Sequence, residues 1–567
     1  MTTFAAIDAA VAAVADRKEA WTGVAIPERI DILGELTQRT GRLAGDWAET
    51  AGRIKRIKPG SPALGEEWMS GPYALLESIG ALQTTLRALQ AGDSPIAGRR
   101  IGDRPGGRLS VEVFPWNVFD RLLLSGYHSE VWMEPGVERD DLPLTIGGAY
   151  STGGAGRMCL ILGAGNITSI PPLDILTKLF VENQVALVKP NPLTDPLVPL
   201  WEDLFAPLVS NSYLRFVTGD ASEGAHLTRH AAVDTIHVTG GGATHDAIVF
   251  GRGDEGAARK ARGEPEIDKP VTSELGGVGP TIVLPGPWRE ADFRYQAEHL
   301  VTQRLHNNGN NCVASQVLVL PEAWDGSERL VDAIRDVMRS HRPRHPYYPG
   351  TSARRRRALE GRDDVEVLGH GEAPATLIPG LSPDSGDPFF TEEVFGPVYA
   401  TTSLGGDGAA TFLDGAIEFG NDALSGTLGA NIIAHPATLK GLGGRLDDAI
   451  AQMRYGTVGV NVWSGIGFLA PRSAWGAFPG HTPADVGSGI GMVHNALMFG
   501  RAERNVARGP FYPFPRSVLH REWHLSPKPP WFVTHRKADV VAEKLTRFAA
   551  APRWRRLPGI VLAALRG

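Results

Sequence analysis

Short apolar runs alternate with helix-length segments from about residue 157 onward, and this alternation constrains the fold more than any other feature of the chain. The predicted strands lie at 158–162, 185–188, 214–218 and 235–239. Strands separated by helices pair in parallel through crossover connections. We therefore expect an α/β protein in which ligands bind at the carboxyl ends of the strands.

The length and composition indicate a soluble globular protein with two or three domains. A chain of 567 residues exceeds one ordinary core. Helical spacing at Ile30, Leu33 and Leu36 predicts a helical first hundred residues, and further strands are expected at 281–284 and 316–320. Two cysteines cannot form a disulfide framework, and no metal-ligand spacing is found, so no metal is expected. No apolar run could span a bilayer, and Asp8 interrupts the apolar start, so we expect a cytoplasmic protein.

Three predicted strand ends carry residues that suit a dinucleotide. Asn166 follows the first strand, Lys189 follows the second, and Gly240 and Gly241 precede a helix after the fourth. Glycine lets the backbone approach a pyrophosphate at a helix N-terminus, and a lysine can reach ribose hydroxyls. Each glycine cluster alone is equally typical of an ordinary turn. Their order along the chain favours a cofactor site.

Cys312 follows the run His306-Asn307-Asn308-Gly309-Asn310-Asn311, and Glu274 stands before two glycines at 276–277. A single thiol and a carboxylate are the groups that covalent carbonyl chemistry followed by hydrolysis requires. The other cysteine, Cys159, falls inside an apolar strand and is expected to pack in the core. These residues predict an enzyme with Cys312 as its nucleophile.

The C-terminal segment 501–567 differs in charge from the rest of the chain. It contains 14 Lys and Arg against 4 Asp and Glu, a net charge of +10, whereas residues 1–500 carry −16. Trp523, Trp531 and Trp554 lie among its prolines. Two interpretations remain open: a strap that wraps the acidic body or a neighbouring subunit, or a peripheral contact with anionic lipid. No nucleic-acid partner is expected, because no stacking motif accompanies the charge.

Taken together, these residues resemble the aldehyde dehydrogenase superfamily. The resemblance extends from about residue 20 to 500. Its motifs, in order, are Asn166, Lys189, Thr239-Gly240-Gly241, Glu274-Leu275-Gly276-Gly277, Cys312, Glu393-Val394-Phe395-Gly396-Pro397 and Gly456-Thr457-Val458 with Val460-Asn461. Their combination in this order is far more specific than any one of them.

The resemblance implies a Rossmann-like cofactor domain, an α/β catalytic domain and a small β-hairpin oligomerisation element. The expected boundaries are 1–129 and 157–274 for the cofactor domain, 130–156 for the hairpin, 275–479 for the catalytic domain, 480–500 for an oligomerisation strand and 501–567 for the basic Trp- and Pro-rich extension. It also implies a homodimer or homotetramer.

The resemblance also implies a role for each motif residue. Cys312 is similar to the nucleophile, Glu274 to the general base, and Asn166 to the side-chain half of an oxyanion hole completed by the Cys312 N–H. Lys189 and Glu393 resemble the contacts to the two riboses, Phe395 lies beside the nicotinamide, and Gly240 and Gly241 face the pyrophosphate. Phe114-Pro115-Trp116-Asn117 matches the family's Pro-Trp-Asn more literally, but Asn117 is expected to be a turn residue because only Asn166 ends a strand just before Lys189.

The expected reaction is oxidation of an aldehyde to a carboxylic acid through a thiohemiacetal and a thioester on Cys312. NAD is the expected cofactor, and NADP stays open because the family's Lys-Pro-Ser-Glu is here Lys189-Pro190-Asn191-Pro192, with no acid at the matching place. The glycine triplet 240–242 resembles the CoA-acylating branch, which lacks the glutamate found here at 274. A CoA-acylating enzyme and a catalytically silent scaffold of the same fold stay open. Apolar residues at 122–124 and 463–468 suggest a hydrophobic aldehyde.

Overall fold

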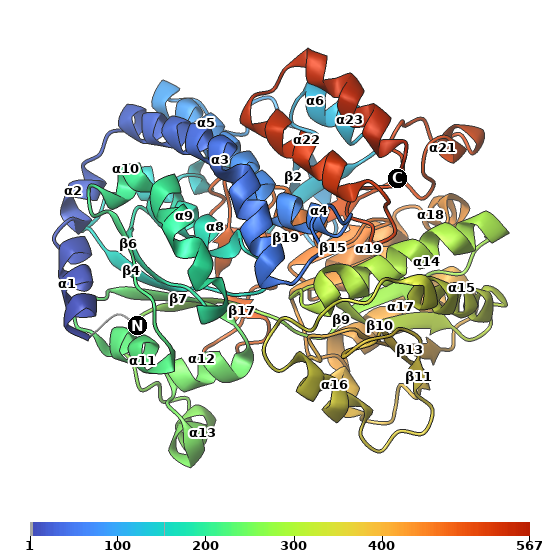
Figure 1. Ribbon diagram of the computed structural model, residues 1–567. Helices are drawn as coiled ribbons and strands as arrows, with labels where there is room; N and C mark the ends of the chain where they lie inside the picture. The colour runs from blue at the N-terminus through green and yellow to red at the C-terminus, as the bar shows by residue number, and fades with distance from the viewer. Residues whose placement is uncertain (1–3, 152) are drawn as a thin grey trace.

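Two β-sheets organise the chain, and the computed structural model describes residues 4–151 and 153–567 (Figure 1). The first sheet has the strand order β17-β8-β7-β4-β5-β6. Its strands are β4 (Met158–Leu162), β5 (Val185–Lys189), β6 (Leu214–Phe216), β7 (Thr235–Gly240), β8 (Val271–Leu275) and β17 (Gly489–Ile490). All neighbours are parallel except β17, which is antiparallel to β8. The predicted strands and their parallel pairing are confirmed, although β6 ends two residues early.

Helices flank this sheet on both faces (Figure 1). They are α1 (Phe4–Ala15), α2 (Lys18–Thr22), α8 (Ile170–Leu176), α9 (Val198–Leu204), α10 (Ala206–Val209), α11 (Ala221–Arg229), α12 (Gly242–Val249) and α13 (Gly253–Arg262), with the irregular turns η3 (Thr177–Val181) and η4 (Pro192–Leu197). The segment 251–269, rich in Gly, Arg and Glu, forms α13, which projects from the edge of this lobe (Figure 1).

The N-terminal region is helical, as its periodicity predicts. The elements are α3 (Ile26–Ile54), α4 (Leu64–Trp68), η1 (Met69–Tyr73) and α5 (Ala74–Ala91). Leu33 and Leu36 are fully buried, so the apolar stripe of α3 faces the core. The helix ends at Ile54, just before Pro59 and Gly60 break the pattern.

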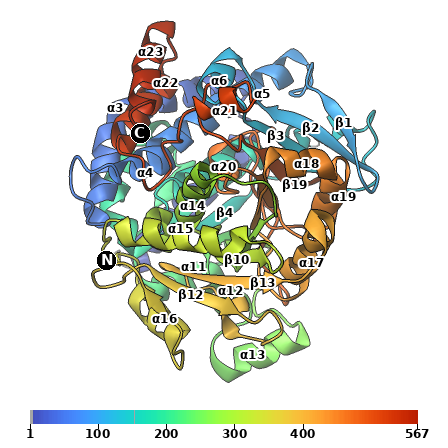
Figure 2. The ribbon, with the colours of Figure 1, turned by 90° about the vertical axis from the view of Figure 1, so that its right-hand side faces the viewer.

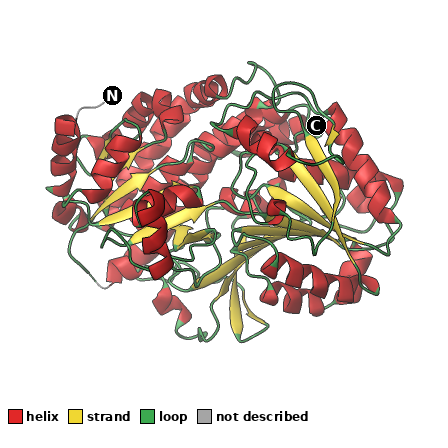
Figure 3. Cartoon of the chain, turned by 90° about the horizontal axis from the view of Figure 1, so that it is seen from below, coloured by secondary structure: helices red, strands yellow, loops and turns green. Residues whose placement is uncertain are grey.

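The second sheet is larger and has the strand order β1-β2-β3-β19-β15-β14-β9-β10-β13-β12-β11 (Figures 2 and 3). Its strands are β1 (Ile101–Arg104), β2 (Arg108–Phe114), β3 (His128–Met133), β9 (Gly279–Val283), β10 (Ser315–Pro321), β11 (Glu366–Val367), β12 (Thr376–Leu381), β13 (Val398–Leu404), β14 (Gly429–Ile433), β15 (Thr457–Val460) and β19 (Ala502–Arg508). Neighbouring strands are parallel in the part of the sheet formed by β12, β13, β10, β9, β14, β15 and β19. Strands β3, β2 and β1 continue the sheet beside β19 in antiparallel pairs.

Helices and short elements complete this second lobe. They are α14 (Glu290–Leu305), η5 (His306–Gly309), α15 (Gly326–Ser340), α16 (Thr351–Leu359), η6 (Pro388–Phe390), α17 (Gly408–Asp422), α18 (Pro436–Leu442), α19 (Arg445–Gln452), α20 (Ile466–Leu469), β16 (Trp475–Gly476) and β18 (Met492–His494). The two short strands β16 and β18 form a separate antiparallel pair.

The position predicted for the β-hairpin, 130–156, is wrong. The antiparallel strands are β1, β2 and β3, so the hairpin occupies 101–133, with α6 (Val118–Leu123) between β2 and β3. Between 134 and 156 the described residues form only loops, η2 (Leu142–Thr145) and α7 (Gly148–Ser151). Strand β3, in which the five residues after the exposed His128 are all buried, ends at Met133, and Pro135 and Gly136 follow.

The C-terminal boundary at 501 also needs correction. Residues 502–508 form β19 in the middle of the larger sheet, so the extension begins after Arg508, while 480–500 supplies β17 and β18. The extension contains α21 (Arg516–Leu519), α22 (Ala538–Ala550), η7 (Trp554–Arg556) and α23 (Leu557–Ala564). Its helices lie over α4 and α6 (Figure 1). No helix in the described part of the chain is both long and apolar enough to cross a membrane.

Candidate active site

Cys312 and Glu274 meet where the two sheets face each other. Glu274 lies at the end of β8 in the smaller sheet, and Cys312 stands just before β10 in the larger sheet. The Cys312 thiol donates a hydrogen bond to Glu274 Oε1 at 3.1 Å. The structure therefore brings together the two residues that the sequence separates by a complete strand, a helix and a loop.

The pKa values of both groups in this pair are raised. Burial raises the pKa of the Cys312 thiol well above its ordinary value, and the adjacent Glu274 carboxylate raises it further. Burial likewise raises the pKa of Glu274, against a smaller opposing effect of the His494 ring. A proton shared between sulfur and carboxylate can thus pass to Glu274 when an electrophile approaches the sulfur.

The loop before Cys312 has an unusual backbone. Asn307 and Asn308 adopt left-handed φ values of 53° and 56°, and Gly309 follows at 74°. A Cβ on Gly309 would lie 2.4 Å from the carbonyl oxygen of Gly396, so only glycine allows this close approach. Arg304 donates to the same Gly396 carbonyl, and Asn310 Nδ2 donates to the Phe395 carbonyl at 2.7 Å. The turn 393–397 is therefore fastened to the loop of the nucleophile.

Asn166 lies against the same loop. Its Nδ2 donates to the Asn310 carbonyl at 3.0 Å, and its own carbonyl accepts from Asn307 Nδ2 at 3.1 Å. The side chain is buried at the end of the loop after β4. Asn117, by contrast, is the N-cap of α6 and accepts from the N–H groups of Phe119 and Asp120, as a turn residue does.

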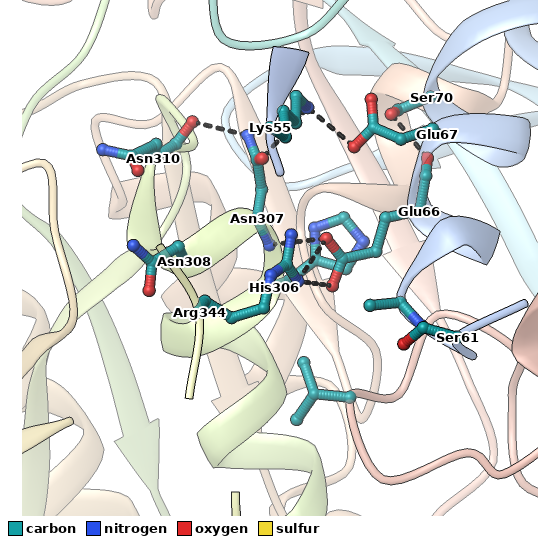
Figure 4. A network of polar contacts seen from close by, with 12 residues as sticks. Lys55, Ser61, Glu66, Glu67, Ser70, His306, Asn307, Asn308, Asn310 and Arg344 are labelled. Carbon is teal, nitrogen blue, oxygen red and sulfur yellow. Dashed lines mark hydrogen bonds and ion pairs between the residues drawn. The ribbon is translucent and has the colours of Figure 1, made fainter. Parts of the chain in front are cut away.

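A buried polar network holds Asn307 from the opposite side (Figure 4). Lys55 Nζ donates to Asn307 Oδ1 at 3.0 Å and pairs with Glu67 at 2.8 Å, with both charged side chains at most 1% exposed. Glu66 accepts from the Asn307 N–H at 3.2 Å and pairs with Arg344 at 3.0 Å. Although burial raises the pKa of Glu66, the charge of Arg344, its hydrogen bond to the carboxylate and other nearby positive charges together outweigh burial and leave that pKa below its ordinary value. Helices α3 and α4 thus anchor the loop of the nucleophile.

The predicted pyrophosphate residues lie at the N-terminus of α12. Gly241 is the N-cap, and a Cβ on Gly241 or Gly242 would meet no atom within 4 Å. Gly240 ends β7, where a Cβ would reach only the Thr244 side chain at 3.9 Å. Open space in front of exposed backbone N–H groups is what an anionic group needs.

Lys189 ends β5, which is separated from β7 by β4 in the sheet, and its side chain is buried. Burial lowers the pKa of its ammonium, while the charges of Asp195 and Glu223 oppose that shift. Glu223 accepts from the N–H of Asp220 at 2.8 Å in the capping box of α11. A carboxylate from a distant segment therefore stands near Lys189, where no acid follows it directly in the sequence.

Glu393 and Phe395 lie on the turn opposite Glu274. A Cβ on Gly276 would lie 2.1 Å from the Glu393 carboxylate, so the carboxylate can occupy this position only because residue 276 has no side chain. Burial raises the pKa of Glu393 to about 7, with Arg304 and Arg354 opposing the shift. Phe395 has a left-handed φ of 45°, and its ring lies 5.0 Å from that of Tyr348.

One group of residues near the pair was not predicted. His494 Nε2 lies 3.1 Å from Asp174 Oδ1, and His237 Nε2 lies 3.5 Å from the same oxygen. Asp174 Oδ2, His494 Nδ1 and Glu274 Oε2 are buried without a hydrogen-bond partner among the described residues. The signal in the sequence was a single acid, Asp174, inside the otherwise apolar segment of α8. Its histidine partner comes from β18, 320 positions later, so no local pattern could reveal it.

Comparisons with known proteins agree with this geometry. The model of the aldehyde dehydrogenase family matches residues 171–353, which include Lys189, Glu274 and Cys312. Succinate-semialdehyde dehydrogenase [NADP(+)] of Mycobacterium avium is 32% identical over 181 residues, covering 29% of this chain and 36% of that protein. Coniferyl aldehyde dehydrogenase of Pseudomonas sp. is 28% identical over 258 residues, covering 42% and 50%. The chain thus spans half or less of the length of these curated relatives.

Solved structures extend the likeness to most of the chain. An NAD-dependent aldehyde dehydrogenase from Sinorhizobium meliloti superimposes with a TM-score of 0.57 at 18% identity, covering 89% of this chain and 86% of that one. The aldehyde dehydrogenase KauB from Pseudomonas aeruginosa gives a TM-score of 0.59 at 15% identity, covering 89% and 88%. At these identities the comparison establishes the fold, and the family model covers the segment that carries the thiol and the carboxylate. Residues 171–353 thus match the aldehyde dehydrogenase family model, and most of the chain has the fold of solved aldehyde dehydrogenases.

Proposed function

We propose that this protein oxidises an aldehyde to a carboxylic acid with NAD, using Cys312 as the nucleophile. The contact of 3.1 Å between the Cys312 thiol and the Glu274 carboxylate carries this proposal. Relatives named as dehydrogenases of succinate semialdehyde and coniferyl aldehyde support the reaction class.

The first step follows from the contact between the Cys312 thiol and the Glu274 carboxylate. Glu274 takes the thiol proton as the sulfur attacks the aldehyde carbon, which avoids a free thiolate beside a buried carboxylate. The resulting oxyanion needs preorganised donors, and Asn166 Nδ2 and the Cys312 N–H are the candidates. Asn166 is fixed by the loop of the nucleophile itself, so the donor and the sulfur keep their relative positions.

The cofactor site fits the residues present. Gly240 and Gly241 offer open backbone at the N-terminus of α12, Lys189 a cation at the end of β5, and Glu393 a carboxylate beside Gly276. When bound, nicotinamide adenine dinucleotide supplies the hydride acceptor. Phe395 stands on the Glu393 turn, where its ring can border the nicotinamide end.

Hydrolysis of the acyl group on Cys312 completes the reaction. Glu274 lies within hydrogen-bond distance of the sulfur, so it can take a proton from water that attacks the thioester. This role separates the proposal from a CoA-acylating enzyme, in which a thiol would replace the water. A silent scaffold would have no need for a buried thiol paired with a carboxylate.

NAD is favoured over NADP by the charge near Lys189. Glu223 and Asp195 surround the ammonium that would meet the adenosine ribose. A 2′-phosphate at that ribose would face two carboxylates. The relative from Mycobacterium avium carries NADP(+) in its name, so this preference separates the two proteins.

The proposal is tested with a panel of aldehydes and both nucleotides, by following the reduced cofactor. The wild-type protein should form acid without CoA, and Cys312→Ala should lose turnover completely. Cys159→Ala is the matched control, because Cys159 is buried within β4 away from the pair. Turnover that survives in Cys312→Ala refutes the assignment, turnover only with CoA supports the acylating alternative, and no cofactor binding supports the scaffold.

For assembly, we propose a homodimer or homotetramer formed through the antiparallel strands. Strand β1 is an outer edge of the larger sheet, so no further strand of the described chain pairs with its free side. Light scattering on purified protein should give a mass of two or four chains of 60.8 kDa. A monomer at micromolar concentration would contradict this proposal.

A peripheral contact with anionic membranes is proposed for the extension. Leu519, Trp523 and Trp554 are 80%, 81% and 60% exposed, next to Arg521, Arg553 and Arg555. Exposed apolar side chains with neighbouring cations match an anionic lipid surface. Sedimentation with phosphatidylserine vesicles should retain the protein, and Trp523→Ser with Trp554→Ser should release it. Equal recovery with phosphatidylcholine vesicles, or no recovery, would contradict the proposal.

A further inference from the structure

A mainly apolar cavity lies under the C-terminal extension. It has a volume of about 290 Å³ and is lined mainly by aliphatic and aromatic side chains. That volume lies at the lower end of the range of ligand pockets, roughly 300–1,000 Å³.

Segments far apart in the chain form the walls of this cavity. Helix α5 contributes Leu76 and Gly80, the loop after α6 contributes Leu124, and α22 of the extension contributes Leu545 and Phe548. Trp531 closes another side, and its ring packs edge-on at 5.9 Å against Tyr127. Without the extension these apolar walls would face solvent, so its helices are part of the site.

A single short segment separates the cavity from the nucleophile. Ile466 and Leu469 of α20 line the cavity, whereas Phe468 of the same helix packs in the cluster that contains Cys312. Trp463, just before α20, belongs to that cluster and donates from its Nε1 to the Val313 carbonyl at 3.1 Å. A chain whose end is at the sulfur can therefore extend past α20 into the cavity.

We propose that this cavity binds the hydrocarbon chain of a long-chain aliphatic aldehyde, with the extension as its outer wall. The inference rests on the proposed function, because it names the class of substrate. A methylene group and a water molecule have similar volumes, roughly 30 Å³ each, so the cavity holds a chain of about ten carbons. Glu77 and Arg472 lie on the same wall with opposite charges, and the rest of the lining is mainly apolar.

Gly80 offers a direct test of the cavity. It lies inside α5, lines the cavity, and a Cβ built on it meets no atom within 4 Å. Gly80→Leu therefore puts a side chain into the space of the substrate while it improves helix propensity. Each methylene kept out of water contributes about a fourfold factor in binding. The ratio of kcat/KM for decanal to that for propanal should fall about tenfold or more.

Two further variants test whether the change in the decanal-to-propanal ratio comes from the cavity. Gly415→Leu is the control, because Gly415 lies inside α17 with the same open space but does not line the cavity. It should leave the ratio as in the wild-type protein. Leu545→Ala enlarges the cavity and should shift the preference toward longer chains.

Binding of decan-1-ol, measured by calorimetry, tests the cavity without any reaction. Wild-type protein should bind it, and Gly80→Leu should weaken the binding about tenfold. Decanol binding without oxidation of any aldehyde would overturn the proposed function and leave the chain site standing. An unchanged ratio and unchanged decanol binding in Gly80→Leu would overturn the chain site, whether or not aldehydes are oxidised.

Discussion

At the scale of single residues, the central feature is a buried thiol that donates a hydrogen bond to a buried carboxylate, whose charge opposes ionisation of the thiol. Cys312 and Glu274 could be predicted from the sequence, because each stands in a distinctive local motif. The choice of Asn166 over Asn117 stays a prediction of function, although the structure gives Asn117 a capping role. The Asp174–His494 contact could not be predicted, since it joins α8 to β18 through the fold alone.

Glu274→Gln should slow both steps that need the base. The amide can take a proton neither from water nor from the Cys312 thiol, so the steady-state rate should fall about 100- to 10,000-fold. The burst that releases the first reduced cofactor, close to one per active site, should become slow as well. Stopped-flow measurement of that burst checks the prediction, and a wild-type steady-state rate in the variant would contradict it.

The raised pKa of Glu274 also predicts the pH dependence of the wild-type enzyme. The carboxylate is the active base, so the hydrolysis rate is lost as pH falls through the raised pKa, above the ordinary carboxyl value of 4.5. The rate should therefore decline at a higher pH than for an exposed carboxylate. A pH–rate profile that stays flat down to the ordinary carboxyl range would contradict this assignment.

Glu223→Gln should relax the choice of nucleotide. The amide keeps an oxygen for the Asp220 N–H but removes a negative charge near Lys189. We expect kcat/KM for NADP to rise about 5- to 10-fold, as for removal of one partly screened repulsion. Glu255→Gln, on the exposed face of α13, is the control and should leave both nucleotides unaffected. An unchanged NADP rate in Glu223→Gln would place the ribose elsewhere.

At the scale of elements, strands with uniform burial could be located from the sequence, whereas the hairpin could not. Strand β4 matches its predicted bounds, because an apolar run in a parallel sheet is buried on both faces. The hairpin lies about 25 residues earlier than predicted, because its strands are short, irregular and interrupted by α6. The hairpin was placed at 130–156 from the family resemblance, and the described residues between 134 and 156 contain no strand.

Gly309→Ala should destabilise the loop that carries the nucleophile. The substitution meets a left-handed φ of 74° and the Gly396 carbonyl 2.4 Å from the new Cβ. Backbone strain of this kind costs about 1–3 kcal/mol. Gly263→Ala is the matched control, since Gly263 has a φ of 65° but no atom within 4 Å of a Cβ. The free energy of unfolding in urea and kcat should both fall further in Gly309→Ala than in Gly263→Ala. Equal decreases in the two variants would mean that the Gly396 contact is unimportant.

At the scale of the whole molecule, the extension turns a surface groove into an interior. The sequence shows a basic, tryptophan-bearing segment, but composition cannot tell which surface it covers. The structure shows that Gly65 of α4 allows the close approach of α22, because a Cβ there would lie 2.6 Å from the Ala538 backbone. Lys528 pairs with Glu298 of α14 at 3.1 Å, which fastens the segment before α22. The strap interpretation is therefore supported for one chain.

Enclosure by the extension makes global stability depend on Glu77. Burial raises the pKa of Glu77 from 4.5 to about 7, helped by Asp120. The folded state holds this proton more tightly than the unfolded state, so stability is lost as pH rises from about 4.5 to 7 and stays lower above. Glu77→Gln should raise the free energy of unfolding by about 1–3 kcal/mol at pH 8 and by little near pH 4.5.

Thermal denaturation at both pH values measures this difference. Glu264→Gln, on the exposed turn after α13, is the control and should show no such dependence on pH. A gain for Glu77→Gln of the same size at both pH values would mean that packing, and not the carboxyl proton, is responsible.

Strand β8, which carries Glu274, ends at Leu275, and only three residues separate it from Gly279, the first residue of β9 in the other sheet. The link between the two sheets at this point is therefore short, and it contains Gly276 and Gly277. Because the base belongs to one sheet and the sulfur to the loop before a strand of the other, the distance between them depends on how the two sheets are held against each other. A substitution that shifts one sheet against the other should therefore change the transfer of the thiol proton even when both residues are kept.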